Sequence, residues 1–310
     1  MNYIYSVITV VAVFSLLTLA LNIQFGQGGI INFGLVGFFA VGAFTFAVLT
    51  QPPPSELDQY ALGLAMNPWP AAALAIAASV LVAFALGKPA LRLRPDYLAL
   101  ATFAFAQVLE ALLINVRSVA NGSIGLSGLE PPFVEVIPLQ NYDLWFMVAT
   151  LVVLAIVYLV LSRVVHAPFG ASLRAARDDA VAASALGKPV AKLRMRALLL
   201  GAGISGVAGV LYASYTTVAA PELFTANVTF TAFIALVIGG TGSNLGAVAG
   251  AAIFFGLEEL LNLLPLTGDT AQFVASARII PFGLALILVL RFAPQGLLGS
   301  RDAQSVAGST

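Results

Sequence analysis

Long apolar runs separated by short polar stretches are the dominant pattern along this chain. Runs of about 20 apolar residues are long enough to cross a bilayer core roughly 30 Å thick as single helices. The pattern therefore predicts an all-α, polytopic membrane protein that forms one transmembrane domain over residues 1–310. We expect about nine transmembrane helices, at residues 3–23, 29–50, 69–87, 97–115, 143–162, 195–216, 221–239, 246–264 and 274–292.

The composition agrees with a membrane protein and excludes several kinds of site. The chain is 60% hydrophobic and 9% charged, whereas soluble domains carry about 25% charged residues. Its formal net charge is zero, so no basic field would draw it to nucleic acid. With no cysteine and a single histidine, His166, we expect no disulfide, metal site or cysteine nucleophile. The first apolar segment follows no Lys or Arg, so we interpret it as a retained span rather than a signal peptide.

The basic residues predict which side of the membrane each loop occupies, because Lys and Arg concentrate in cytoplasmic loops. With nine spans, all but Arg117 and Arg278 of the 14 basic residues fall on one side, and the loops on the other side are acidic. We therefore expect the N-terminus outside and the C-terminus in the cytoplasm. The cytoplasmic set is Lys88, Arg92, Arg94, Arg163, Arg174, Arg177, Lys188, Lys192, Arg194, Arg196, Arg291 and Arg301.

Two segments rich in Gly and Asn interrupt the apolar pattern, one in each half of the chain. They are QFGQGGIINFGLVG (residues 24–37) and GGTGSNLGAVAG (residues 239–250). Paired Gly-interrupted segments point to an internal repeat around a transport pathway. Broken helices expose backbone groups that only protein or a water-filled cavity can satisfy. Close helix packing or tight loops at the membrane edge are the alternative interpretation. The candidate pathway residues are Gly28, Gly29, Asn32, Gly34, Gly239, Gly240, Gly242, Asn244 and Gly246.

Ionisable residues inside the apolar segments are few and lie away from their centres. Glu110, Glu258 and Glu259 fall toward the predicted outer ends of their helices. A proton-coupled secondary transporter needs ionisable residues deep in the membrane, so this distribution argues against one. Coupling to Na⁺ through backbone carbonyls stays open.

Residues 170–194 differ from the rest of the chain because they carry seven of its 28 charged residues (14 basic and 14 acidic). Good helix formers run from Ala171 to Leu186, and Gly187 followed by Pro189 is a helix stop signal. We expect one short cytoplasmic helix whose Arg174 and Asp178, four residues apart, can pair. Either its small face docks in a partner's groove, or the stretch is a solvated loop. That face consists of Leu173, Ala176, Ala180 and Ala183.

The stretch from Gly170 to Ala213 resembles the cytoplasmic loop and following span of LivM-type permease subunits from branched-chain amino acid ABC importers. That family's pattern is G-x-x-L-R-A-x-R-x-[DE]-x-x-A-A-x-x-x-G, and the chain fits it up to Gly187. The resemblance covers nearly the whole chain in the same order, although VANGSIGLSGL (119–129) departs from the family's Thr-Gly-Gly pattern. Further similar stretches are residues 21–43, 89–108, 221–251 and 293–299.

The resemblance implies that a short helix near residues 170–187 inserts into a cleft of an ATP-binding subunit and couples its closure to opening of the pathway. The residues that would carry this coupling are Gly170, Arg174, Arg177, Asp178, Asp179 and Gly187. The chain itself has no phosphate-binding loop, because both of its Gly-Lys pairs lack the upstream Gly and the following Ser or Thr. We therefore expect no cofactor on this chain and ATP with Mg²⁺ on partner subunits.

The sequence thus predicts a permease subunit, not an enzyme, in the inner membrane of a bacterial cell. It would import branched-chain or related small amino acids by alternating access. The expected partners are a second, homologous permease subunit in a heterodimer, two ATP-binding subunits and a periplasmic solute-binding protein. Urea or short amides are alternative substrates. A stand-alone secondary transporter or channel is an alternative class, and a membrane enzyme would need converging nucleophiles or carboxylates that the sequence lacks.

Overall fold

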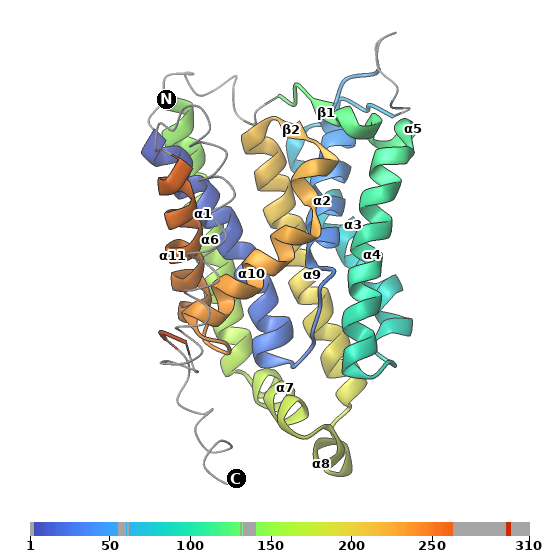
Figure 1. Ribbon diagram of the computed structural model, residues 1–310, viewed down its shortest axis with the longest axis vertical. Helices are drawn as coiled ribbons and strands as arrows, with labels where there is room; N and C mark the ends of the chain where they lie inside the picture. The colour runs from blue at the N-terminus through green and yellow to red at the C-terminus, as the bar shows by residue number, and fades with distance from the viewer. Residues whose placement is uncertain are drawn as a thin grey trace, which may run out of the picture.

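The computed structural model is a bundle of long helices with short connections (Figure 1). In the part of the chain it describes, six helical stretches are long and apolar enough to cross a membrane. These are Tyr3–Gln27, Pro68–Ala90, Pro95–Asn115, Tyr142–His166, Val190–Thr216 and Pro221–Gly239. The described residues are 3–54, 60, 62–130, 132, 141–262 and 296–298.

The all-α, polytopic character predicted from the sequence is confirmed, but the count of nine spans is not. Two further predicted segments form α2 (Leu35–Thr50), which is shorter than a usual span, and α11 (Asn244–Asn262). The ninth predicted segment, residues 274–292, lies outside the described residues. The only strands in the described ranges are β1 (Leu126–Ser127) and β2 (Val218–Ala219), which pair antiparallel.

Local sequence signals set where several helices begin. Helix α3 (Pro68–Ala90) follows Asn67, whose side chain accepts a hydrogen bond from the Trp69 backbone N–H at 3.1 Å. Helix α4 (Pro95–Asn115) also begins at a proline. A first-turn proline sacrifices no intrahelical hydrogen bond, and its fixed backbone angle suits a helix start. Proline and an Asn cap therefore mark these starts on the sequence.

Helix α9 (Val190–Thr216) is the centre of the bundle and packs against α1 (Tyr3–Leu21), α2 and α3. Small residues permit close contacts here, because a Cβ added at Gly42 would lie 2.7 Å from the Gly206 Cα. Close backbone approach through small residues is the usual way that membrane helices associate. Only 17% of the apolar window of α6 (Tyr142–His166) is buried, against 67% for α9. The outer face of α6 is therefore available to lipid or to another subunit.

Helix α1 does not end in an ordinary helical cap but widens into a π-helical turn, η1 (Asn22–Gln27). The chain then runs irregularly to α2, which begins at Leu35 and not near residue 29 as predicted. The prediction was wrong because Gly29 adopts a positive φ of 63° that ends the helical path. The first Gly-rich segment therefore does break a helix, as expected from its composition.

The two ends of the bundle carry different connections (Figure 1). At one end lie β1, β2 and the short helix α5 (Arg117–Ala120). At the opposite end lie α7 (Pro168–Asp178) and α8 (Ala180–Ala185), which project below the long helices. Helix α10 (Ala226–Gly239) crosses the bundle obliquely and is preceded by a single 3₁₀ turn, η4 (Pro221–Phe224).

Candidate coupling and pathway site

Residues 170–187 form two helices rather than the single helix predicted from the sequence. Helix α7 ends at Asp178, and Asp179 is extended with φ −148° and ψ 103°. The Asp179 carboxylate accepts hydrogen bonds from the backbone N–H groups of Val181 and Ala182 at 2.8 and 2.9 Å. Asp is among the best residues for capping a helix N-terminus. The side chain that was expected to contact a partner therefore starts a second helix.

The stop at Gly187 is confirmed. Gly187 has a φ of 76°, and its N–H donates to the Ser184 carbonyl at 2.9 Å while the Lys188 N–H donates to the Ala183 carbonyl at 3.0 Å. This pair of bonds is the glycine-based ending known as the Schellman motif. It leaves the side chain of Leu186 81% exposed, and Val181 on the same helix is 78% exposed.

A tight turn at Gly170 sets the direction of α7 relative to α6. A Cβ on Gly170 would lie 2.0 Å from the Val165 carbonyl oxygen, so no larger residue fits there without moving the backbone. The turn folds α7 back against the end of the bundle, where it packs on η1 and α9. Gly170 therefore has a structural role in the turn between α6 and α7.

The small face of α7 is buried within this chain, which corrects the expectation that it docks in a partner's groove. Leu173 and Ala176 are fully buried. The first Gly-rich segment provides the surface beneath them. A Cβ on Gly28 would lie 3.4 Å from the Leu173 Cδ1, and one on Gly29 would lie 2.8 Å from the Arg177 Cγ. We call Gly28 and Gly29 the seat of α7.

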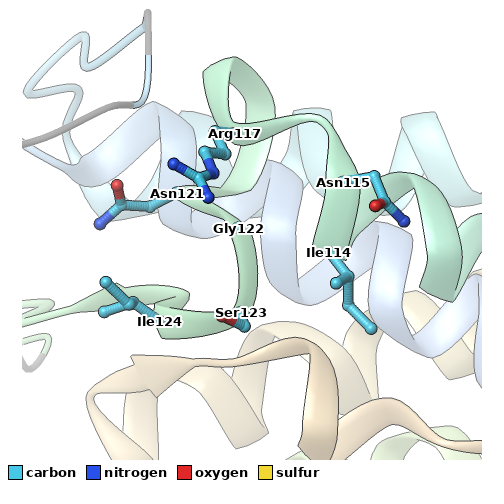
Figure 2. Close-up of a pocket in the computed structure, with 7 residues that line it drawn as sticks. All are labelled: Ile114, Asn115, Arg117, Asn121, Gly122, Ser123 and Ile124. Carbon is cyan, nitrogen blue, oxygen red and sulfur yellow. The ribbon is translucent and has the colours of Figure 1, made fainter.

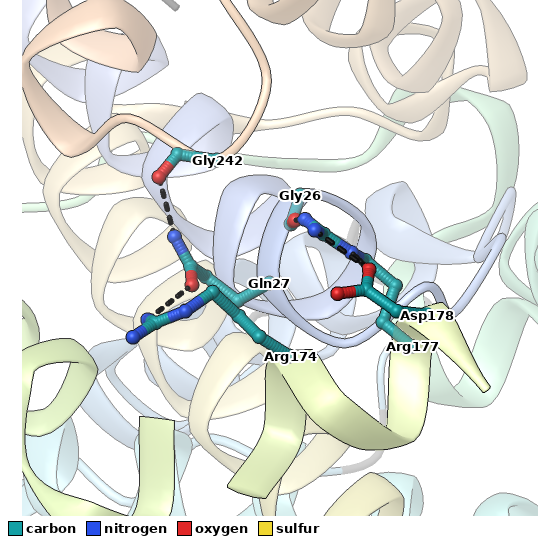
Figure 3. Close-up of polar contacts among 6 residues, drawn as sticks. All are labelled: Gly26, Gln27, Arg174, Arg177, Asp178 and Gly242. Atoms are coloured by element: carbon teal, nitrogen blue, oxygen red, sulfur yellow. Dashed lines mark hydrogen bonds and ion pairs between the residues drawn. The ribbon is translucent and has the colours of Figure 1, made fainter. Parts of the chain in front are cut away.

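The two arginines of α7 also face this chain, as Figure 3 shows. Arg174 donates from one Nη1 to the Gln27 side-chain oxygen and to the Val165 carbonyl, both at 3.1 Å. Arg177 donates to the Gly26 carbonyl oxygen at 2.5 Å. Gly26 and Gln27, which accept these hydrogen bonds, both lie in the π-helical turn. Helix α7 is thus hydrogen-bonded directly to the point where α1 breaks.

The predicted pair between Arg174 and Asp178 does not form. The Asp178 carboxylate instead lies 2.9 Å from the Arg177 guanidinium. Arg174 points from the helix toward Gln27, which takes it away from Asp178 (Figure 3). The Arg177 and Asp178 side chains are 31% and 57% exposed, so this ion pair contributes little to stability.

Side-chain amides replace the hydrogen bonds that the first Gly-rich segment loses. Asn32 donates to the Gln24 side-chain oxygen at 2.8 Å and accepts from the Gly34 N–H at 2.8 Å. Gln24 in turn donates to the Leu198 carbonyl on α9 at 3.2 Å. Both amides are buried, and buried polar groups must be paired to avoid a large desolvation cost. Asn32 therefore holds the break in shape.

The second Gly-rich segment is hydrogen-bonded to the first across the bundle. The Gly242 N–H donates to the Asn22 side-chain oxygen at 2.8 Å, and the Gly242 carbonyl accepts from the Gln27 side chain at 2.5 Å. Asn22 also donates to the Asn244 side-chain oxygen at 2.9 Å. A Cβ on Gly26 would lie 2.6 Å from the Gly242 nitrogen. The structure thus brings the two predicted segments into direct contact.

Two of the predicted pathway glycines instead serve the packing of α10 on α11. A Cβ on Gly239 would lie 1.9 Å from the Gly246 carbonyl oxygen, and one on Gly250 would lie 2.0 Å from the Ala235 carbonyl. Gly246 and Gly250 have the spacing of a small-residue packing motif. The packing interpretation therefore accounts for Gly239 and Gly246. Gly240, with φ 116°, ends α10 and lies against Gly296.

Sequence reasoning missed three buried amides that join these elements, Asn22, Gln24 and Gln27. They stand in LNIQFGQGG, directly beside the glycines that were identified as candidates. Polar side chains within an otherwise apolar span are costly unless paired. Their presence at the end of the first apolar run was the signal that could have found them.

A separate pocket of about 380 Å³ lies at the opposite end of the bundle from α7 (Figures 1 and 2). Its lining overlaps the start of the stretch that departs from the family pattern. The start of α1 lies at this end of the bundle too, and there the Tyr3 hydroxyl donates to the Glu259 carbonyl oxygen at 2.7 Å. The pocket is lined by Ile114, Asn115, Arg117, Asn121, Gly122, Ser123 and Ile124.

These features define a multi-pass membrane protein in which a short peripheral helix is joined to two broken membrane segments. The chain belongs to the family described as "Branched-chain amino acid transport system / permease component", which matches residues 3–289. The resemblance seen in the sequence is therefore confirmed. No solved structure matches the chain significantly.

Three curated relatives illustrate the range of this family. The chain is 28% identical to the high-affinity branched-chain amino acid permease LivM of Salmonella typhimurium, over 94% of this chain and 68% of the relative. It is 25% identical to the LivH permease of the same organism, over 96% and 95%. It is also 27% identical to the guanosine ABC transporter permease NupQ of Bacillus subtilis, over 91% and 88%.

Proposed function

We propose that this chain is a permease subunit of an ABC importer that moves branched-chain amino acids inward by alternating access. The observation that carries the proposal is the direct hydrogen bonding of α7 to the break in α1, through Arg174 and Arg177. A peripheral helix that is bonded to a broken membrane segment can move that segment when a partner displaces the helix. The family membership and the two Liv relatives support the importer class and the substrate.

The partners follow from the same class. An ATP-binding subunit would supply ATP and Mg²⁺, because the chain lacks a phosphate-binding loop. Two such subunits would act on a pair of homologous permease subunits, and a solute-binding protein would deliver the substrate outside. The similarity to both LivM and LivH supports a heterodimeric permease pair. The exposed face of α6 offers a surface for lipid or for that second subunit.

We further propose that α7 and α8 lie on the cytoplasmic side of the inner membrane, with the N-terminus of the chain outside. The supporting observation is the clustering of Arg and Lys in and around these helices. Arg174 and Arg177 face inward, so the ATP-binding subunit would contact the exposed Val181 and Leu186 of α8. Gly170 and Gly187 would fix the two ends of this element.

The transport pathway would run beside the contact between the two Gly-rich segments. The amides of Asn32 and Asn244 and the Gly242 carbonyl provide polar groups at this contact. The solute-binding protein would supply most of the affinity for the substrate. These polar groups would therefore not need to bind the substrate tightly as it crosses.

The test is purification from native membranes in mild detergent, followed by uptake of labelled leucine into proteoliposomes. We expect an ATP-binding subunit to copurify and uptake to require internal ATP. Changing both Val181 and Leu186 to Ser should remove the ATP-binding subunit, whereas the same change at the exposed Leu81 of α3 and Leu100 of α4 should not. Uptake that is independent of ATP would support a stand-alone transporter instead. If guanosine or urea inhibits the uptake of labelled leucine and valine does not, the proposed substrate class is wrong.

A further inference from the structure

Gln27 joins two groups that have opposite hydrogen-bonding requirements (Figure 3). Its amide oxygen accepts from the Arg174 guanidinium at 3.1 Å, and its amide nitrogen donates to the Gly242 carbonyl at 2.5 Å. A guanidinium can only donate and a carbonyl can only accept. The orientation of the Gln27 amide is therefore fixed by its neighbours, and a side chain with only one of these capacities cannot replace it.

The other end of this connection is a turn that depends on the first segment for its hydrogen bonds. Gly242 has a φ of 85°, and both its N–H and its carbonyl are bound by side chains of the π-helical turn, Asn22 and Gln27. Gln27 is 1% exposed, and its bond to the Gly242 carbonyl is part-buried. Leaving a polar partner unpaired in a low-dielectric environment is costly. Movement of the Gln27 amide must therefore move the Gly242 turn or break this bond.

We propose that Gln27 is a positioning residue that transmits displacement of α7 to the second Gly-rich segment. This inference rests on the proposed function, in which the ATP-binding subunits displace α7. Arg177 pulls the first segment directly through the Gly26 carbonyl. Arg174 reaches the second segment through the Gln27 amide. One helix would thus shift both broken segments together, which alternating access requires.

The sharpest variant is Gln27→Glu. A carboxylate accepts from Arg174 even better than an amide does, but it has no hydrogen to donate to the Gly242 carbonyl. The change therefore removes the hydrogen bond to the Gly242 carbonyl and keeps the hydrogen bond from Arg174. The matched control is Asn67→Asp on α3, because Asn67 uses only its oxygen, to accept from Trp69. A carboxylate keeps that function.

The first measurement compares leucine uptake with ATP hydrolysis in proteoliposomes that contain the purified complex. We expect Gln27→Glu to retain the ATP-binding subunits and to lower uptake per ATP hydrolysed by at least roughly fivefold, the ratio that corresponds to one lost buried hydrogen bond. Asn67→Asp should keep the wild-type ratio. A wild-type ratio in an assembled Gln27→Glu complex would overturn the inference.

The second measurement follows the two segments separately. The chain has no cysteine, so single spin labels can be placed at Ala175→Cys on α7 and at Thr241→Cys beside Gly242. In the wild-type background both labels should change mobility when ATP is added. In the Gln27→Glu background the α7 label should respond as in wild type. The Thr241→Cys label should respond less but not fall silent, because Asn22 still joins the π-helical turn to Gly242 and Asn244. A response at Thr241→Cys that is unchanged by Gln27→Glu would show that the second segment moves by another route.

A third variant tests the inference in case the Gln27→Glu permease does not assemble with its ATP-binding subunits. Arg174→Met removes the guanidinium from the peripheral end of the connection and leaves the buried amide in place. It should give the same reduced response at Thr241→Cys, and an assembled variant that transports like wild type would contradict the inference. If the α7 label does not respond to ATP in the wild-type complex, the coupling role of α7 fails and the inference fails with it. A responding α7 label with a silent wild-type Thr241→Cys label would overturn the inference alone.

Discussion

The two Gly-rich segments face the same physical problem and solve it in different ways. Both leave the regular helical hydrogen-bonding pattern, and a backbone group left unsatisfied in a membrane is costly. The first segment joins its own amides, because Asn32 bonds both Gln24 and the Gly34 N–H. Its Phe33 and Val36 N–H groups donate to Thr102 and Thr229 of other helices. In the second segment, Gly242 is held on both sides by Asn22 and Gln27 of the π-helical turn, and the Gly246 N–H donates to the segment's own Ser243 hydroxyl.

This difference implies a direction of control between the segments. The first segment also forms the seat of α7 and accepts the bonds of both arginines. It therefore stands between the peripheral helix and the second segment. A disturbance of the first segment should propagate to the second, whereas a local change in the second should not alter the seat of α7.

Gly26→Ala should have the largest effect, because it breaks the contact between the segments. The new Cβ would lie 2.1 Å from the Asn22 Oδ1 and 2.6 Å from the Gly242 nitrogen. Overpacking of this kind costs about 1–3 kcal/mol, and here it strikes a buried hydrogen-bond network as well. We expect a lower thermal unfolding midpoint in detergent and loss of uptake.

The matched control is Gly256→Ala on α11, where no atom lies within 4 Å of the added Cβ. Alanine favours a helix over glycine by roughly 0.5–1 kcal/mol, so this variant should be as stable as wild type or more stable. Equal behaviour of the two variants would refute the close contact between the segments.

Asn22→Leu and Asn32→Leu should separate the two segments. Each change leaves buried groups unpaired at a cost of about 1–3 kcal/mol per group. Only Asn22→Leu removes a bond to Gly242, so only this variant should increase the mobility of a spin label at Thr241→Cys. Asn32→Leu should lower stability and leave that label unchanged. A mobile Thr241→Cys label in both variants would mean that the second segment depends on the whole shape of the first.

Gly29→Ala should disturb α7 and leave the second segment in place. The added Cβ would lie 2.8 Å from the Arg177 Cγ, and the positive φ of 63° adds backbone strain of about 1–2 kcal/mol. Gly187→Ala is the comparison, since its φ is 76° but no atom lies within 4 Å of the new Cβ. Only Gly29→Ala should mobilise a label at Ala175→Cys. An immobile label there would show that α7 does not rest on this glycine.

Asp179→Ala should have the smallest effect, confined to α8. The loss of a helix N-cap costs about 1 kcal/mol, and Asp179→Ser should restore most of it. Hydrogen exchange of the Val181 and Ala182 amides measures the change directly, because these are the groups that Asp179 caps. Unchanged exchange in Asp179→Ala would mean that α8 forms without its cap.

The sequence by itself determined the membrane class, most span positions, the two Gly-rich breaks and the charged helical stretch near residues 170–187, because apolar run length, Gly content and charge are local properties. It also determined the stop at Gly187, since a glycine followed by Pro189 leaves the helix little choice. The family resemblance added the permease class, which the match over residues 3–289 confirmed.

Only the tertiary structure decided which groups meet. Arg174 and Asp178 have the spacing of an ion pair, yet Arg174 bonds Gln27, which is 147 positions away along the chain. The small face of α7 has the pattern of a docking surface, yet the same chain covers it. Asn22 and Gln27 give no sign of their partner Gly242 in the local pattern. Such pairings depend on helix directions and close approach of distant segments, which periodicity and composition do not encode.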